Sequence, residues 1–561
     1  MKQQESVQGH ERATLARRSA YASLGVLLSR FSGVFRSQVV NAVFGASTRL
    51  DAFNVALRFP SVLRDLFAEG ALSAAFTKEL VEADNHGKDS VRELVSIITG
   101  FFLLFTLTLS LLMCFYAEPL ISAVTSESFR QRGGFSLAVL CFRVLVFYLP
   151  IAMLSAVAMS ILGNRGQTFR ATIASAFFNL GTIVGALLGG SIAAVLDVDA
   201  IAGLAVGTLA GGILQFCYQV FPLVREGLFP WPSFSPRSWV RCQPLRSVLT
   251  MMAPRAVSQG ALSLALFVNT HFATAAGEGA ITYITNAQVI ILVPVGLFGV
   301  AASFASLPML SQAVHDRNAE KLGTLLSDSL QNSLWLSWLS LVAFAIVGVP
   351  FCAVLLEHGQ VTANDTIQNA VAVCAYSIGM FFNSGSKVLM QGFYALNDVR
   401  RSVINASIYL FVNATLSFLL APRYGIIGLG LSNSIAAAVD FSLNWYFLNK
   451  VSNRNGLPMS QLHGPLGKTL RRSLLFLALF AFCIGILGVY LASEVWLPHG
   501  DIWMVFGSNR FLTAFIWMIS LGLIWLLFSL FLLKIFGPIH LRQQTDRMLS
   551  RIKLLNKIRP K

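Results

Sequence analysis

Seven charged residues gather in two apolar stretches near the N-terminus, where charge is costly if the stretches cross a membrane. Arg30 and Arg36 fall in the first stretch. The second stretch holds Asp51, Arg58, Arg64, Asp65 and Glu69. A charged side chain inside a membrane-spanning helix costs about 2.5–3.5 kcal/mol on insertion scales, so such residues are rare and usually functional. Arginine presents a planar fork of donors that suits phosphate oxygens. The arginines therefore predict an anion-binding site, and the acids could hold them in place through ion pairs.

A helical projection separates the charges of the second stretch into two groups. At 100° per residue, four of them fall within about 40° of one another: Asp51, Arg58, Asp65 and Glu69. Arg64 points about 120° away from them. We expect Arg30, Arg36 and Arg64 to face a water-filled cavity and to bind the substrate.

The composition explains why these stretches are expected to span a membrane. The 561 residues are 55% hydrophobic and 12% charged, and the mean hydropathy is +0.66. Soluble domains average about 25% charged residues, and about 20 apolar residues span the hydrocarbon core. The sequence therefore predicts an all-α integral membrane protein with 14 transmembrane helices. The predicted spans are 22–43, 52–79, 94–116, 135–162, 170–195, 200–221, 247–275, 280–312, 326–356, 367–395, 402–421, 425–448, 473–493 and 511–536.

The loops between these spans alternate between rich and poor in Lys and Arg. The poor loops hold only Arg49, Arg130, Arg132, Arg423 and Arg510. The positive-inside rule then places both termini in the cytoplasm. The net charge of +16 could indicate nucleic-acid binding in a soluble protein, but here it follows from membrane topology. The polar, basic N-terminal segment has no apolar core, so we expect no cleavable signal peptide.

An internal repeat predicts two bundles. Residues 200–216 (AIAGLAVGTLAGGILQF) resemble residues 425–441 (GIIGLGLSNSIAAAVDF), and small residues, which let helices approach closely in lipid, dominate both. Repeats with a site between them are a common transporter plan. The expected organisation is a cytoplasmic segment (1–21), a six-helix bundle (22–221), a cytoplasmic linker (222–246), a second six-helix bundle (247–450), a cytoplasmic loop (451–472), two extra helices (473–536) and a basic cytoplasmic tail (537–561).

Other chemistries find little support in the sequence. The seven cysteines show no CxxC spacing, and there is no phosphate-binding glycine loop, no HExxH and no nucleotide domain. We expect a transporter without cofactor or metal, not an enzyme. Without an ATPase, transport must use a gradient, the membrane potential or partner proteins. Isolated charges also occur at Arg143, Arg255, Lys387 and Asp440. For these, an interfacial position or a structural ion pair is at least as well supported as ligand binding. Asp440 could serve ion coupling, although polar helix packing explains it better.

Residues 28–76 carry a long and specific pattern: LSRFSGVFRSQVVNAVFGASTRLDAFNVALRFPSVLRDLFAEGALSAAF. This segment closely resembles the start of MurJ (MviN) proteins, and GNRG at 163–166 and KVLMQGFYALND at 387–398 fit more loosely. The family belongs to the multidrug/oligosaccharidyl-lipid/polysaccharide exporter superfamily. The resemblance implies a central cavity, alternating access, and a groove for the lipid tail near the last two helices.

The resemblance also implies the substrate and its ligands. Members flip lipid II, the undecaprenyl-pyrophosphate-linked peptidoglycan precursor, from the cytoplasmic to the periplasmic leaflet of the inner membrane. The family's cavity residues carry over onto Arg30, Arg36, Asp51, Arg64 and Glu69. An anion moving outward gains about 2.3 kcal/mol per charge per 100 mV in a cell that is negative inside, so the membrane potential is a candidate driving force.

This sequence departs from the family's pattern at several positions. An arginine of the eighth span aligns with Val289, for which Arg255 is a candidate substitute, and acids found in members align with Ser37 and Asn269. The family's usual proline after the AF motif is Lys78 here. These changes affect the predictions of ion coupling and of pyrophosphate binding by a full set of arginines more than they affect the prediction of the fold.

Three other functions compete with this interpretation. A drug or cation exporter of the same superfamily should favour acids and aromatics over arginines in its site. A flippase for another polyprenyl-linked glycan is excluded only by the resemblance. A membrane scaffold for cell-wall synthesis proteins would not need the charges in the first two spans.

Overall fold

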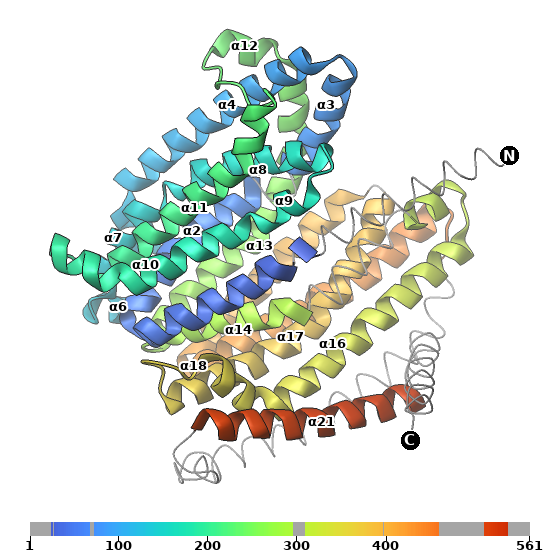
Figure 1. Ribbon diagram of the computed structural model, residues 1–561. Coiled ribbons are helices and arrows are strands. Elements are labelled where there is room, and N and C mark those ends of the chain that lie inside the picture. Colours follow the sequence, from blue (N-terminus) through green and yellow to red (C-terminus); the bar gives the residue numbers. More distant parts are fainter. Residues whose placement is uncertain are drawn as a thin grey trace, which may run out of the picture. The chain divides into compact units, whose positions relative to one another are not determined.

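The chain folds as helices. The computed structural model describes residues 24–25, 27–67, 72–294, 309–396, 398–458 and 510–536, and every regular element within these ranges is a helix (Figure 1). The predicted all-α class is confirmed. In the described ranges, six helices are long and apolar enough to cross a membrane: Lys88–Phe115, Gly134–Asn164, Thr168–Ser191, Ala200–Arg225, Ala319–Leu356 and Ile404–Arg454. The predicted span 473–493 lies outside the described residues.

The chain divides into two compact units, which we describe separately. The first comprises residues Met1–Thr282 and His358–Val361, and the second Tyr283–Glu357 and Thr362–Lys561. After a first helix over residues 27–44, the first unit contains α2 (Thr48–Phe67), α3 (Ser73–Asn85), α4 (Lys88–Phe115), α5 (Ala117–Val124), α6 (Glu127–Gln131), α7 (Gly134–Leu145), α8 (Tyr148–Asn164), α9 (Thr168–Ile173), α10 (Ser175–Leu196), α11 (Ala200–Arg225), α12 (Pro236–Arg241) and α13 (Gln243–Ala276).

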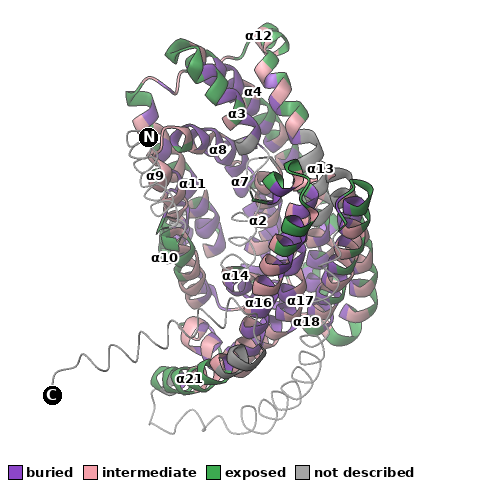
Figure 2. Ribbon diagram, turned by 90° about the vertical axis from the view of Figure 1, so that its right-hand side faces the viewer, coloured by how far each residue is buried: buried purple, intermediate pink, exposed green. Residues whose placement is uncertain are grey.

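The core of the first unit lies where α3, α4, α8 and α13 meet. Phe76, Ile98, Phe102 and Met153 are at most 2% exposed in this cluster. Other large apolar side chains of α4, such as Phe115 (78% exposed), are not covered by the rest of the unit. In Figure 2, exposed residues are green and buried residues purple. Apolar residues on the outside and inside of one helix are expected where lipid is the solvent.

Helices α10 and α11 pack through glycines. Three glycines spaced four residues apart on α10 (Gly181, Gly185 and Gly189) face three on α11 (Gly203, Gly207 and Gly211). A Cβ atom on Gly185 would lie 2.7 Å from the Gly207 Cα, and one on Gly207 would lie 2.3 Å from the Gly185 Cα. The small residues that the sequence singled out at 200–216 thus do bring two helices into backbone contact.

This close approach predicts a position-specific cost of adding one methyl group. Gly207→Ala should lower the unfolding temperature of the full-length protein, because overpacking of this kind costs about 1–3 kcal/mol. Gly190→Ala is the matched control, since a Cβ at Gly190 on α10 meets no atom within 4 Å. Thermal unfolding followed by circular dichroism distinguishes the two. Equal unfolding temperatures for both variants would contradict the glycine packing.

The second unit contains α14 (Ala280–Pro294, whose first three residues belong to the first unit), α16 (Ala319–Leu356), α17 (Ala363–Ala395), α18 (Val399–Arg454) and α21 (Arg510–Phe536). Helix α18 is two helices merged across a kink at Gly425, whose φ of 53° is in the left-handed region. The kink separates the predicted spans 402–421 and 425–448. The indole nitrogen of Trp525 donates to the Leu339 carbonyl at 3.0 Å, which attaches α21 to α16.

Candidate functional site

The first helix is positioned against α10 by small polar side chains. The hydroxyls of Ser29 and Ser175 share a hydrogen bond. The Asn179 amide nitrogen donates to the Ser32 hydroxyl at 2.8 Å. A Cβ atom on Gly33 would lie 3.6 Å from the same amide nitrogen of Asn179. Because hydrogen bonds between helices fix rotation as well as distance in a membrane, these contacts determine where Arg36 points.

Arg36 and Arg64 lie close enough for their charges to interact. The Arg36 guanidinium interacts electrostatically with Arg64 on α2 and with Tyr148 on α8, and its central carbon is 6.0 Å from the centroid of the Phe178 ring on α10. Arg36 is half-buried, and none of the described carboxylates forms an ion pair with it. Arg36 is therefore half-buried beside the Phe178 ring, with Arg64 near enough to influence its charge.

Arg64 also has an acidic neighbour on its own helix. Its Nε and Nη2 atoms donate to one oxygen of Asp65 at 3.1 and 2.8 Å. The side chains are 29% and 39% exposed, so solvent screens the pair and it contributes little stability. The prediction that an acid holds an arginine in place applies to this pair.

Arg30 lies on the first helix, six residues before Arg36, which corresponds to about 9 Å along the axis. Its side chain is exposed. The first helix thus carries Arg36 half-buried and Arg30 exposed.

Asp51 lies in a different environment from the two arginines. It is 1% exposed, and its carboxylate accepts three hydrogen bonds from the start of α14. The donors are the Gly279 N–H at 2.8 Å, the Thr282 N–H at 2.9 Å and the Thr282 hydroxyl at 2.8 Å. A carboxylate is favoured at a helix N-terminus, where the first N–H groups lack partners within the helix. In this structure Asp51 fastens α2 to the α13–α14 hairpin.

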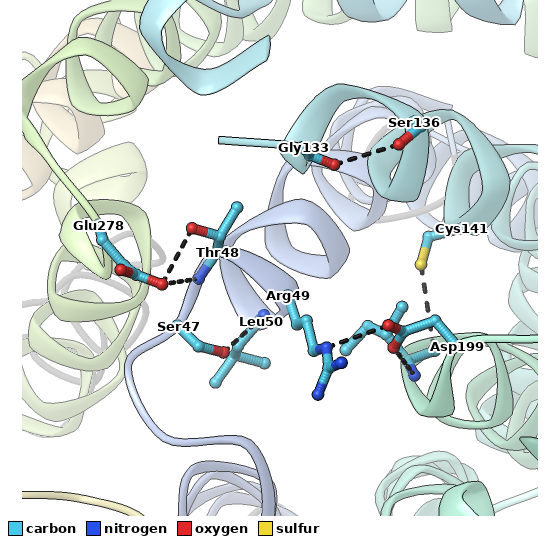
Figure 3. Close-up of polar contacts among 10 residues, drawn as sticks. Ser47, Thr48, Arg49, Leu50, Gly133, Ser136, Cys141, Asp199 and Glu278 are labelled. Atoms are coloured by element: carbon cyan, nitrogen blue, oxygen red, sulfur yellow. Dashed lines mark hydrogen bonds and ion pairs between the residues drawn. The ribbon is translucent and has the colours of Figure 1, made fainter. Parts of the chain in front are cut away.

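Further contacts hold the same hairpin near Asp51. One carboxylate oxygen of Glu278 accepts from the Thr48 N–H at 2.9 Å and from its hydroxyl at 3.0 Å, as Figure 3 shows. Arg132 donates to the Thr274 carbonyl at 2.7 Å. Sequence reasoning missed Glu278, and its flanking glycines in the turn between two apolar spans were the available signal.

Arg58 shares the Asp51 face of α2, as the projection predicted. Its Nη1 atom donates to the Thr270 hydroxyl, and it lies 3.4 Å from the Leu266 carbonyl. Both partners belong to α13. Arg58 and Asp51 thus bind the α13–α14 hairpin, whereas Arg64 pairs with Asp65.

Two of the predicted site residues are not placed. Glu69 lies outside the described residues. Arg255 belongs to helix α13, but its side chain is also outside what the structure describes. Val289, which aligns with a family arginine, is half-buried on α14.

Two of the isolated charges elsewhere, Arg143 and Asp440, contact neighbouring polar side chains. Arg143 pairs with Glu118 at 3.1 Å, with both side chains largely exposed. Asp440 accepts from the Asn444 amide at 2.9 Å, and the Asn405 amide donates to the Asn444 oxygen at 2.7 Å. This network joins the two halves of α18 and agrees with polar helix packing. Lys387 is half-buried on α17. Among the described residues, no cluster of His, Cys, Asp and Glu could hold a metal ion.

Long apolar helices packed into two compact units define a multi-pass membrane protein. A solved structure supports the fold: the inward-facing conformation of a multidrug resistance MATE family transporter of the MOP superfamily matches with a TM-score of 0.60 and 18% identity, covering 75% of this chain and 96% of that one.

More specific matches come from one family. The sequence model of "Lipid II flippase MurJ" matches residues 40–507. The lipid II flippase MurJ of Burkholderia cenocepacia is 31% identical over 425 residues, covering 76% of this chain and 82% of the relative. A probable lipid II flippase MurJ of Bdellovibrio bacteriovorus is 28% identical over 444 residues, covering 79% and 83%. A structure titled "Lipid II flippase MurJ, inward closed conformation" matches with a TM-score of 0.66 and 25% identity, covering 91% and 98%.

The chain therefore belongs to the lipid II flippase MurJ family. It is a transporter rather than an enzyme, and a multi-pass protein of the bacterial inner membrane.

Proposed function

We propose that this chain moves lipid II, the undecaprenyl-pyrophosphate-linked disaccharide peptide, from the cytoplasmic to the periplasmic leaflet by alternating access. Family membership supports the substrate. The excess of Lys and Arg in alternate loops supports an orientation with both termini in the cytoplasm. The product would supply cell-wall synthesis, and proteins of that process are the partners we expect.

The observation that carries the proposal is the half-buried Arg36, with which none of the described carboxylates forms an ion pair. A charged side chain within a membrane-spanning helix is costly and usually functional. A pyrophosphate would supply the missing negative charge to Arg36 through charge-assisted hydrogen bonds, which are about twice as strong as neutral ones. The isoprenoid tail would stay in lipid, so only the polar headgroup needs a hydrated path.

We assign the other predicted residues to the same path. Arg30, at the exposed start of the first helix, would meet the headgroup before Arg36 does. Glu69 and Arg255 are retained as substrate-binding candidates because of the family pattern. Asp51 would reach substrate only in a conformation in which its bonds to Gly279 and Thr282 have opened.

We also propose the organisation from which alternating access follows. Two six-helix bundles, 22–221 and 247–450, would rock against each other around the substrate. The extra helices within 473–536 would offer a groove to the lipid tail.

Leaflet-resolved measurement of lipid II in cells depleted of this protein tests the function. Lipid II should accumulate in the cytoplasmic leaflet and fall in the periplasmic one, while sensitivity to cationic drugs stays unchanged. Expression of the wild-type protein should restore the distribution. If the protein were a drug or cation exporter, its depletion would leave the distribution of lipid II unchanged and would raise the sensitivity to cationic drugs. A flippase for another glycan would leave lipid II unaffected and trap a different polyprenyl-linked sugar.

A further inference from the structure

The segment between α11 and α13 is fastened to one end of α4. The Ser233 N–H donates to the Ser96 carbonyl at 2.9 Å, and the Ser96 hydroxyl donates to the Trp231 carbonyl at 2.7 Å. A Cβ on Gly100 would lie 1.9 Å from the Ser233 carbonyl oxygen, so only glycine admits this approach. The Trp239 indole also donates to that oxygen, at 3.0 Å. The segment therefore has a defined position on α4.

This fastened segment turns apolar side chains outward. Trp231 is 92% exposed and Val240 is 88% exposed. Exposure of a large apolar side chain to water forgoes about 1.5–3 kcal/mol of burial. The basic residues Arg237 and Arg241 are also exposed. They lie one turn apart on the side of α12 away from Trp239, from which only their long side chains extend around the helix. Tryptophan together with arginine is the composition of a segment at a membrane–water interface.

An apolar groove begins beneath this segment. It has a volume of about 400 Å³ and is lined by Phe101, Leu104, Phe105, Thr108, Leu109, Leu112 and Trp239. The Trp239 ring meets the Phe101 ring edge-on, with centroids 5.7 Å apart. From residue 101 to residue 112 the groove follows α4 for about 16 Å. That length is about half of a hydrocarbon core of roughly 30 Å, which is the depth of one leaflet.

We propose that α4 and α12 form a binding site for one anionic phospholipid. Its acyl chain would lie in the groove below Trp239, and its phosphate would interact with Arg237 and Arg241. The depth of one leaflet fits a phospholipid chain, whereas a polyprenyl tail is longer than the groove. The two arginines select a negatively charged headgroup over a zwitterionic one. This site lies wholly within the first unit and is separate from Arg36 and Arg64.

Lipid titration of the purified full-length protein tests the headgroup contact. Phosphatidylglycerol should raise the unfolding temperature more than phosphatidylcholine with the same chains. Arg237→Gln with Arg241→Gln should weaken the apparent affinity for phosphatidylglycerol about tenfold or more. The control pair Lys450→Gln with Arg454→Gln, exposed at the end of α18, should not. Equal phosphatidylglycerol responses in both double variants would overturn the headgroup assignment.

Native mass spectrometry tests the groove itself. Thr108→Phe fills the groove and should lower the fraction of protein that retains a bound phosphatidylglycerol. Leu111→Phe is the control, because Leu111 is 55% exposed on the same helix and does not line the groove. An equal loss in both variants, or retention of undecaprenyl phosphate in place of phosphatidylglycerol by the wild type, would overturn the proposal.

Discussion

Replacing Arg36 with alanine should lower the rate of lipid II flipping about tenfold or more, and Arg64→Ala should have an effect of similar size. Hydrogen bonds to charged groups contribute about 1.5–3 kcal/mol each, and 1.4 kcal/mol corresponds to a factor of ten. Arg36→Lys should fall between the wild type and Arg36→Ala, because lysine keeps the charge but lacks the planar fork. The double variant should lose less than the product of the two single losses, since both side chains act on one pyrophosphate.

Flipping in proteoliposomes that contain the purified protein and lipid II measures these effects. Arg143→Ala is the matched control, because Arg143 pairs with Glu118 at the exposed surface of the same unit. Its flipping rate should match that of the wild type. Normal flipping by Arg36→Ala at wild-type protein levels would show that the paired arginines do not grip the substrate.

Much of the helical arrangement follows from local sequence. Hydropathy located the central parts of α4, α11 and α16, because a helix must be apolar over the length that crosses the hydrocarbon core. The small residues at 200–216 predicted a close approach of helices, and α10 and α11 make it. The 100° rule placed Asp51 and Arg58 on one face of α2, and both do bind the α13–α14 hairpin. Each of these properties depends on residues within a few turns of one another.

The partners across the fold could not be predicted in the same way. Asp51 binds a backbone N–H that lies 228 residues further along the chain, and a backbone donor leaves no trace in residue types. The direction of Arg36 depends on the rotation of the first helix, which Ser32 fixes by accepting from Asn179, 147 residues away. A sequence pattern shows that these residues are polar and does not show which of them meet.

Asp51→Asn should loosen the attachment of α2 to α14 and reduce flipping. The carboxylate accepts from both the Gly279 and Thr282 N–H groups, whereas an asparagine side chain offers one acceptor oxygen and turns an NH₂ donor toward the other N–H. Leaving one buried donor unsatisfied costs about 1–3 kcal/mol. Loss of the negative charge also weakens the interaction with the N-terminus of α14. Amide hydrogen exchange at Gly279 and Thr282 should therefore accelerate, by about tenfold where the loss reaches 1.4 kcal/mol.

Hydrogen exchange with mass spectrometry on the substrate-free protein separates two roles for Asp51. Glu278→Gln is the control, because Glu278 accepts from Thr48 at an exposed position where water can replace the bond. In this variant, amide exchange at Gly279 and Thr282 should change little. If Asp51 holds the helices together, exchange and flipping change in parallel in Asp51→Asn. If Asp51 instead serves only as a ligand for lipid II, flipping falls while exchange in the free protein stays at the wild-type rate. The three hydrogen bonds to the start of α14 favour the first result, because a substrate ligand buried to 1% exposure would have to break all of them before it could bind.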